Sequence, residues 1–318
     1  MINVGKIVIR IASSLKGTNF AIFLLLAVVL VGAGAWYTIR PAIKAGDQST
    51  ASDSKTITVI AGGDVSMGRQ TGQKILAGEI DYPFVNIADT LKSADVAFVN
   101  LESQLADLDG ETESPTSEYR FAGPPEGAQS LANAGIDIVS VANNHMWDYG
   151  KARLEETLKY LTDQEILYVG ANIDTEKIYG PKIIEVRGKK IAFLAMTNIL
   201  NGYENAGANQ YVSFQRPDRI IEEIGELRDK VDWIFVSVHS GTEYAAEPSS
   251  QLVELTHSFI DAGADAVIGH HPHVPQKIEI YNGRPIFYSL GNFAFWQPFS
   301  FWTQNSFLAK FKLTTPHK

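Results

Sequence analysis

Three histidines lie within four positions in the sequence G-H-H-P-H at 269–273, directly after the apolar run 266–268. Pro272 prevents a helix from continuing through this segment, so one extended loop can present both His271 and His273. Imidazole nitrogens are common ligands of divalent transition metals. The segment therefore predicts a metal site at the end of a buried strand.

Side chains of other ligand types follow four further apolar runs. These candidate ligands are Asp64, Glu102, Asn144 and His239, after the runs 58–61, 96–99, 138–141 and 234–238. The carboxyl ends of parallel strands line one crevice of an α/β sheet, so this recurrence predicts a single site built from distant segments. Zinc, manganese and iron accept such mixed shells, and two ions roughly 3.5 to 4 Å apart can clamp a phosphoryl oxygen.

Each candidate ligand also has a purely structural interpretation. Asp64 could serve in a turn or as a helix cap, Glu102 could be a solvated loop carboxylate, and His239 could be a satisfied core histidine. Near the metal candidates, Asp148 could orient an imidazole, and Glu243 could either cap the following segment or act in proton transfer.

Composition excludes several kinds of protein. The 318 residues contain no cysteine, which rules out disulfides and thiolate metal sites, so any metal must use nitrogen and oxygen ligands. The net charge of −9 disfavours nonspecific binding to nucleic acid, and we expect no nucleic-acid partner. The sequence contains neither a phosphate-binding loop that ends in Lys-Ser/Thr nor a Gly-x-Ser-x-Gly motif.

Residues 20–39 carry no charge and are mostly apolar, which is about the length of a membrane-spanning helix. More basic residues precede this segment than follow it, so we expect a single-pass cell-membrane protein with a cytoplasmic N-terminus and an extracellular C-terminal domain. The alternative is secretion after cleavage of a signal peptide, because the small residues 33–35 resemble a cleavage site. The predicted division of the chain is a cytoplasmic segment 1–19, an anchor 20–39, a flexible linker 40–55 and a folded domain 56–318.

From residue 56 onward, expected strands and helices alternate, which is typical of α/β domains with largely parallel sheets. Two hairpins interrupt the alternation, one turning at 187–189 and one at Asn282-Gly283. We therefore expect an α/β domain with mixed strands, either in one sheet or in two sheets packed face to face. The expected strands are 56–61, 96–101, 136–141, 182–186, 190–196, 233–238, 266–268, 276–281 and 285–290, and the expected helices are 85–92, 125–134, 151–161, 217–229 and 249–262.

Six motifs of the domain occur in a fixed order. They are G-D-V-S-M-G-R at 63–69, N-L-E at 100–102, A-N-N-H-M-W-D-Y-G at 142–150, H-S-G-T-E-Y at 239–244, G-H-H-P-H-V at 269–274 and I-F-Y-S-L-G-N-F at 286–293. This order resembles the CapA-type poly-γ-glutamate capsule proteins over residues 57–295, nearly the whole predicted domain.

The resemblance implies a calcineurin-like metallophosphoesterase fold, in which two mixed β-sheets form a sandwich flanked by helices. It implies a shell for two divalent metal ions, manganese, zinc or iron, formed by Asp64, Glu102, Asn144, His239, His271 and His273. It also implies that His145 acts as acid or base, with Asp148 and Glu243 as further catalytic candidates. Substrate contacts are expected from Arg69, Asn143 and Asn292.

The sequence departs from the usual pattern of that fold at three positions. Asp64 is not followed by the expected Asp-x-His histidine, Glu102 replaces a bridging aspartate, and Ser240 replaces an aromatic residue. Phosphatase activity therefore does not follow from the fold alone.

Three functions remain open from the sequence. The first is a capsule component that acts on poly-γ-glutamate or another anionic polymer, together with membrane-bound capsule synthesis subunits. The second is an extracellular metal-dependent phosphoesterase with an unrelated substrate, and the third is a noncatalytic polymer-binding or assembly subunit. The aromatic stretch 293–302 either covers the core or forms an apolar lip that faces a membrane or partner.

Overall fold

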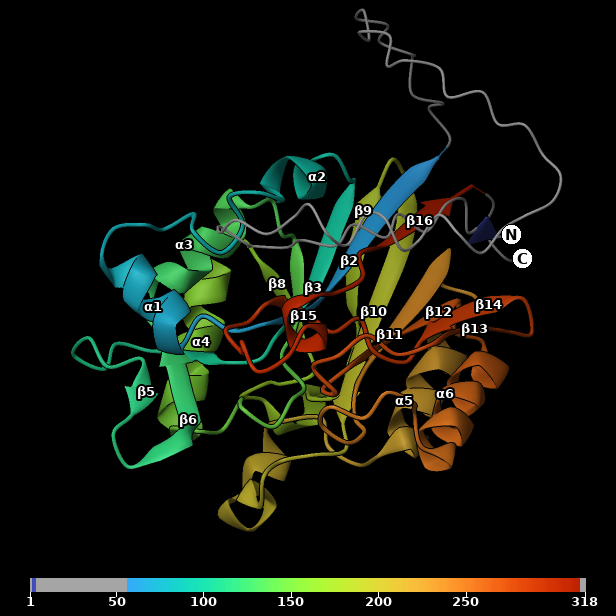
Figure 1. Ribbon diagram of the computed structural model, residues 1–318. Coiled ribbons are helices and arrows are strands. Elements are labelled where there is room, and N and C mark those ends of the chain that lie inside the picture. Colours follow the sequence, from blue (N-terminus) through green and yellow to red (C-terminus); the bar gives the residue numbers. More distant parts are fainter. Residues whose placement is uncertain (1, 4–55, 315–318) are drawn as a thin grey trace, which may run out of the picture. The chain divides into compact units, whose positions relative to one another are not determined.

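The computed structural model describes residues 2–3 and 56–314, whose strands form two large sheets and one small one (Figure 1). The first sheet has the order β1-β16-β2-β3-β7-β8, and β15 pairs with β2. Strands β15, β2, β3, β7 and β8 are parallel, whereas β16 is antiparallel to β2. The bounds are β1 Ile2–Asn3, β2 Ile57–Val65, β3 Val96–Leu101, β7 Ile138–Ser140, β8 Leu167–Val169, β15 Asn292–Ala294 and β16 Ala309–Leu313.

The second sheet has the order β13-β14-β12-β11-β10-β9 and is parallel from β10 through β14. Its outer strands β9 and β13 belong to the two predicted hairpins, which are both confirmed. The bounds are β9 Lys182–Val186, β10 Lys189–Thr197, β11 Trp233–His239, β12 Ala266–His270, β13 Ile278–Tyr281 and β14 Arg284–Phe287. A small sheet contains β4 Gln104–Leu105, β5 Glu113–Ser114 and β6 Ser117–Gly123.

The two large sheets pack face to face through an aromatic core. Phe98 of the first sheet stacks on Phe193 of the second at 5.5 Å between ring centroids, and Phe235 of the second meets Phe311 of the first at 5.0 Å. Every residue of β3 and β11 is buried, as expected for continuous apolar runs covered on both faces. The predicted α/β class with mixed sheets flanked by helices is confirmed.

Helices cover the outer faces of both sheets. Helices α3 and α4 contribute to the apolar core of the first sheet, and α5 and α6 to that of the second (Figure 1). In α5, buried Ile220, Ile224 and Leu227 recur at helical spacing, and Ser249 caps α6 by accepting a hydrogen bond from the Leu252 N–H. The bounds are α1 Arg69–Leu76, α2 Ala88–Lys92, α3 Glu126–Asn133, α4 Gly150–Asp163, α5 Pro217–Leu227 and α6 Ser250–Ala262.

The expected localisation needs correction. Among residues 2–3 and 56–314, no helix has both the length and the apolar character needed to cross a membrane. This finding overturns the prediction of a single-pass cell-membrane protein. The segment 20–39, on which that prediction depended, lies outside the described residues, as does the proposed linker 40–55.

Gly63 allows a close approach of β2 and the chain that leads into β15. A Cβ atom at this position would lie 1.8 Å from the carbonyl oxygen of Gly291, and the same carbonyl accepts a hydrogen bond from the Asp64 N–H at 3.0 Å. We expect Gly63→Ala to lower the free energy of unfolding by about 1–3 kcal/mol, because the two backbones must separate. Urea denaturation measures this change.

The matched control is Gly225→Ala in α5, where an added Cβ would have no atom within 4 Å. Because alanine favours helices, this variant is expected to be more stable than wild type by roughly 0.5–1 kcal/mol. Equal stabilities for Gly63→Ala and wild type would contradict the close approach.

Candidate metal centre

The six predicted metal ligands converge at the carboxyl ends of five strands. All six side chains are buried, including the two carboxylates. The register explains their convergence, because Asp64 pairs with Asn100 across β2 and β3, and His239 pairs with His270 across β11 and β12. The ligands are Asp64 in β2, Glu102 after β3, Asn144 after β7, His239 in β11, and His271 and His273 after β12.

Glu102 lies at the centre of this group. Its Oε1 lies 3.4 Å from Nε2 of His239, 3.8 Å from Nε2 of His273 and 4.0 Å from Nε2 of His145. The carboxylate is fully buried, yet neither oxygen has a hydrogen-bond partner among the described residues. An unpartnered buried carboxylate is costly, so this arrangement fits a bound cation.

Two ligand groups share Glu102. One consists of Glu102, His271 and His273, the other of Asp64, Glu102 and His239, and the ligand atoms of each group lie within 4.8 Å of one another. The Oδ1 of Asn144 lies 2.7 Å from Nε2 of His239 and adds a neutral oxygen. Carboxylate, amide and imidazole donors suit manganese, zinc or iron.

The pKa values of the two carboxylates are shifted in opposite directions. Burial alone would raise the pKa of Asp64, but the imidazoles of His270 and His273, at 3.2 and 3.4 Å from its oxygens, hold this pKa well below its ordinary value. Burial raises the pKa of Glu102 well above its ordinary value, and the charges of Asp64 and Glu243 raise it further. A bound cation would favour the ionised form of Glu102.

Two of the buried imidazoles, those of His239 and His271, have lowered pKa values that favour the neutral form. Burial lowers the pKa of His239 well below its ordinary value, and the neighbouring His271 lowers it further. Burial, followed by the charge of His273, lowers the pKa of His271 to about 3. Neutral imidazole is the form that binds metal.

Asp148 orients the imidazole of His145 toward Glu102. Its Nδ1–H donates to Oδ2 of Asp148 at 2.8 Å, and the same oxygen accepts a hydrogen bond from the Phe121 N–H at 3.1 Å. The Phe121 ring lies 4.2 Å from the imidazole between centroids. The other ring nitrogen, Nε2, therefore faces Oε1 of Glu102 at 4.0 Å, where it is in position to exchange a proton with a reacting group.

Arg69 is held in a fixed position near the site by contacts with three residues. Its backbone φ is +52°, its Nη2 donates to the carbonyl of Glu118 at 2.6 Å, and its Nε lies 3.3 Å from a carboxylate oxygen of Glu113. The guanidinium carbon lies 4.3 Å from the centroid of Phe121. Arg69 is thus fixed against Phe121, the aromatic residue that packs on His145.

Comparison with known proteins decides the family. The family model of bacterial capsule synthesis protein PGA_cap matches residues 58–297. The chain belongs to this family. The resemblance to CapA-type proteins is thereby confirmed, since capsule biosynthesis protein CapA of Bacillus anthracis is 30% identical over 295 residues, which cover 91% of this chain and 71% of the relative. PGA biosynthesis protein CapA of Bacillus subtilis is 29% identical, covering 94% and 78%.

Solved structures give weaker similarities. A hypothetical protein from Thermus thermophilus is 19% identical with a TM-score of 0.44, and the match covers 74% of this chain and 76% of that one. A 5'-nucleotidase from Candida albicans is 12% identical with a TM-score of 0.44, covering 75% and 46%.

Three residues that were predicted to bind substrate or to act in catalysis belong to neither ligand group of this PGA_cap protein. The amide of Asn143 donates to the carbonyl of Leu101 at 2.8 Å and its oxygen accepts from the His145 N–H. Asn292 accepts from Nδ1 of His273 at 2.9 Å, which leaves Nε2 of that histidine free for a metal. Glu243 is exposed on the loop after β11 and belongs to neither ligand group. Asn292 thus positions the predicted ligand His273, and Asn143 positions His145, the predicted acid or base.

Two further residues contact the predicted ligands. Nδ1 of His270 lies 3.2 Å from Oδ1 of Asp64, and Nδ2 of Asn100 donates to the same oxygen at 2.9 Å. Both residues lie within motifs that the chain shares with its family, and these motifs are the sequence features by which the two residues could have been predicted. Phe121 had no sequence signal, because its place depends on the fold of β6.

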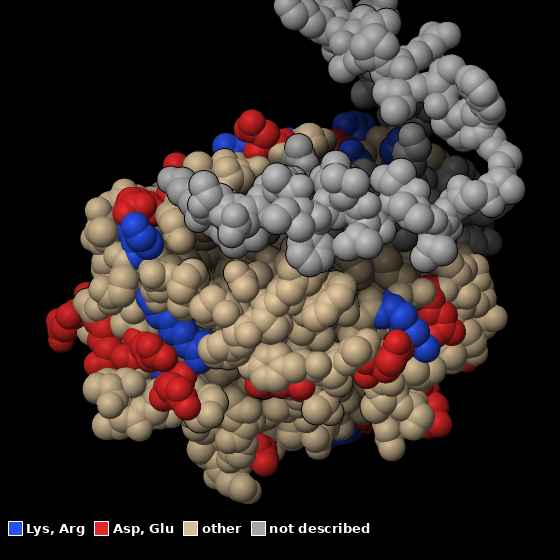
Figure 2. Space-filling model, in the orientation of Figure 1, with Lys and Arg blue, Asp and Glu red and all other residues tan. Residues whose placement is uncertain are grey.

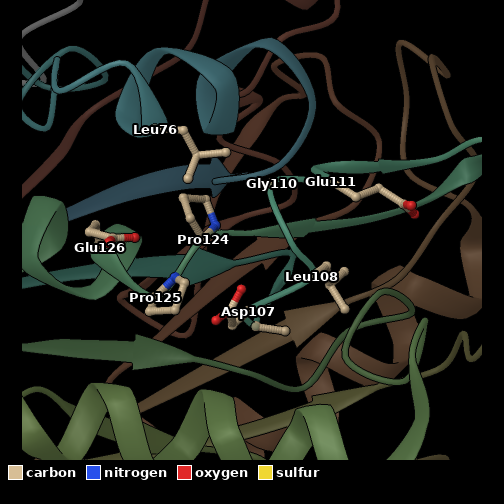
Figure 3. A pocket seen from close by; sticks show the side chains of 9 residues that line it. Leu76, Asp107, Leu108, Gly110, Glu111, Pro124, Pro125 and Glu126 are labelled. Atoms are coloured by element: carbon tan, nitrogen blue, oxygen red, sulfur yellow. The ribbon is translucent and has the colours of Figure 1, made fainter.

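A small cavity of about 100 Å³ lies apart from these ligands. None of the predicted site residues lines it, and its walls include acidic side chains (Figure 3). Residues in its lining are Leu76, Asp107, Glu111, Pro124, Pro125 and Glu126. This cavity is therefore a poor match for the anionic substrates expected from the PGA_cap family.

Proposed function

We propose that this PGA_cap protein acts in poly-γ-glutamate capsule synthesis as a divalent-metal-dependent hydrolase or transferase. The observation that carries the proposal is the position of Glu102, a buried carboxylate without hydrogen-bond partners among the described residues, which shares its ligand groups with three histidines. A site used only for structure would need no such unpartnered charge, because an apolar side chain would pack there at lower cost.

Two ions of manganese, zinc or iron would be held by the two groups that share Glu102, with Asn144 beside His239. Such ions supply Lewis acidity and a nucleophilic hydroxide near neutral pH. His145 would exchange a proton with the reacting group through Nε2, and Asp148 would hold the imidazole in the required tautomer.

The substrate proposed for this site is an anionic glutamate polymer or its precursor. Arg69 supports this proposal, because its guanidinium lies over Phe121, the ring that packs on His145, and a guanidinium can bind a carboxylate or phosphate group. Relatives are named for capsule and PGA biosynthesis, which supports the same substrate class and suggests other capsule synthesis subunits as partners.

Metal analysis of the purified protein tests the proposal. We expect wild type to retain divalent metal, and the Asp64→Ala/His271→Ala double variant to lose it, because one ligand is removed from each group. Turnover of phosphoester and γ-glutamyl substrates is measured in the same samples and should be lost together with the metal. Cleavage of the γ-glutamyl substrate would indicate action on the polymer, whereas cleavage of the phosphoester would indicate a phosphoesterase.

The matched control is an Asp229→Ala/His257→Ala double variant, which changes the same residue types outside both ligand groups. It should keep metal and turnover. A folded wild type that stays metal-free in excess manganese or zinc would refute the proposed function.

A further inference from the structure

Aromatic side chains form an arc beside the metal-ligand groups. The ring of Tyr244 lies 6.4 Å from Phe299 and 6.2 Å from the imidazole of His273, between centroids. The arc continues from His273 to Phe295 at 4.9 Å and from Phe295 to Phe121 at 5.8 Å. We call Phe121, Phe295, Tyr244 and Phe299 the aromatic arc. One of its ends lies under Arg69 and the other reaches solvent at Phe299, which is 71% exposed.

Tyr244 holds an unfavourable backbone conformation within this arc. Its φ is +62°, a left-handed value that costs roughly 1–2 kcal/mol for a residue with a side chain. Its N–H donates to the carbonyl of Pro272 at 2.8 Å, which ties it to the loop between His271 and His273. Such strain in a bulky residue is concentrated at functional sites.

Other residues of the protein cover the ring of Tyr244 only in part. It is 46% exposed although it lies beside a buried histidine, and its hydroxyl accepts a long hydrogen bond from Nε2 of Gln297 at 3.5 Å. The conformation therefore places a partly open aromatic face next to His273. Packing inside the protein does not account for that placement.

The charge around the arc is unevenly distributed. Arg69 contacts Phe121 at one end and the carboxylate of Glu243 lies beside Tyr244, whereas the surface over β15 and the chain that follows it is mostly uncharged (Figure 2). A polymer with a charge on every unit would need cations along its whole path. This surface instead matches one anionic group followed by an uncharged segment.

We propose that Tyr244 is a substrate-positioning residue whose ring packs against the uncharged segment next to the anionic group that Arg69 binds. The inference rests on the proposed function and narrows its substrate class. The anionic group is a carboxylate or phosphate, and the uncharged segment is the part of the substrate that lies along the arc between Arg69 and Tyr244. The site therefore takes a chain end or a single activated unit, in preference to the interior of a polyanion.

Two matched pairs of ligands test this proposal by calorimetric binding, without turnover. Methylphosphonate and phenylphosphonate carry the same head group, as do γ-glutamylmethylamide and γ-glutamylanilide, and within each pair only the uncharged part differs in size. We expect wild type to bind the larger member of at least one pair more tightly by roughly three- to tenfold, the size of an aromatic contact. The pair with the larger ratio identifies phosphate or γ-glutamyl as the source of the anionic group.

Tyr244→Ala should remove this preference, and Tyr244→Phe should retain it. Tyr82→Ala, which removes another partly exposed tyrosine, should leave it unchanged. Metal content is determined for every sample, so loss of metal in wild type reports on the proposed function separately. An equal preference in Tyr244→Ala and wild type, or no preference in wild type, would overturn the role of Tyr244.

Discussion

Replacement of Glu102 by glutamine is expected to change stability in opposite directions with and without metal. Both ligand groups share Glu102, so one substitution weakens both. At a metal concentration 100-fold above the dissociation constant, wild type should gain about 2.7 kcal/mol in its free energy of unfolding, whereas Glu102→Gln should gain little. Without metal, the variant should be at least as stable as wild type.

The metal-free result follows from burial. The pKa of Glu102 is raised well above its ordinary value, so at neutral pH folding must either bind a proton or bury an unpartnered charge. The unfolded chain keeps the ionised carboxylate in water, and the neutral amide of glutamine avoids this cost. Urea denaturation at pH 7, with chelator and with added manganese or zinc, measures both changes.

Glu185→Gln on β9 is the matched control, because this glutamate is exposed and outside both ligand groups. Its stability should follow that of wild type under both conditions. Equal metal stabilisation of Glu102→Gln and wild type would show that Glu102 does not bridge the two groups.

The second large effect is expected at Asp265, at the start of β12. Its Oδ2 accepts hydrogen bonds from the Ile234 N–H at 2.8 Å and from Nη1 of Arg228 at 2.9 Å, and its Oδ1 lies 2.9 Å from Nη1 of Arg284. Asp265 is fully buried. We expect Asp265→Asn to lower the free energy of unfolding by about 3–5 kcal/mol, because two partly buried guanidinium groups lose their counter-charge.

Asp218→Asn is the control for this prediction, since Asp218 also pairs with an arginine, Arg216, but both side chains are more than half exposed. That change should have little measurable effect on urea denaturation. If both variants unfold at the same urea concentration, the arginine pair does not stabilise this end of β12. Asp265 lies at the opposite end of β12 from His271, so metal content per folded molecule should be unchanged.

The sequence predicted those parts of the fold that carry strong local signals. Apolar runs identified β2, β3, β7, β11 and β12, and a polar residue after each run identified the ligand positions. Helix α1 was missed because its sequence, RQTGQKIL, contains a glycine and few apolar residues. Strands β15 and β16 were missed, because their pairing with β2 is a contact between distant parts of the chain that local patterns do not encode.

Side-chain direction was the main limit on prediction of the site. Residue type alone did not reveal that the amide of Asn292 faces His273, or that Asn143 bonds to the backbone. Residue type also gave no reason to place Phe121 against His145, because this contact requires β6 to reach the ligand region. Such contacts depend on the tertiary structure, whereas the ligands themselves could be recognised from their position after strands.

The ligands are divided between the two large sheets. Asp64, Glu102 and Asn144 come from the first sheet and the early part of the domain, whereas His239, His271 and His273 come from the second sheet. Each of the two ligand groups draws on both sheets. Bound metal would therefore mark molecules in which both sheets have folded and docked, so the chemistry would begin only after assembly of the whole domain is complete.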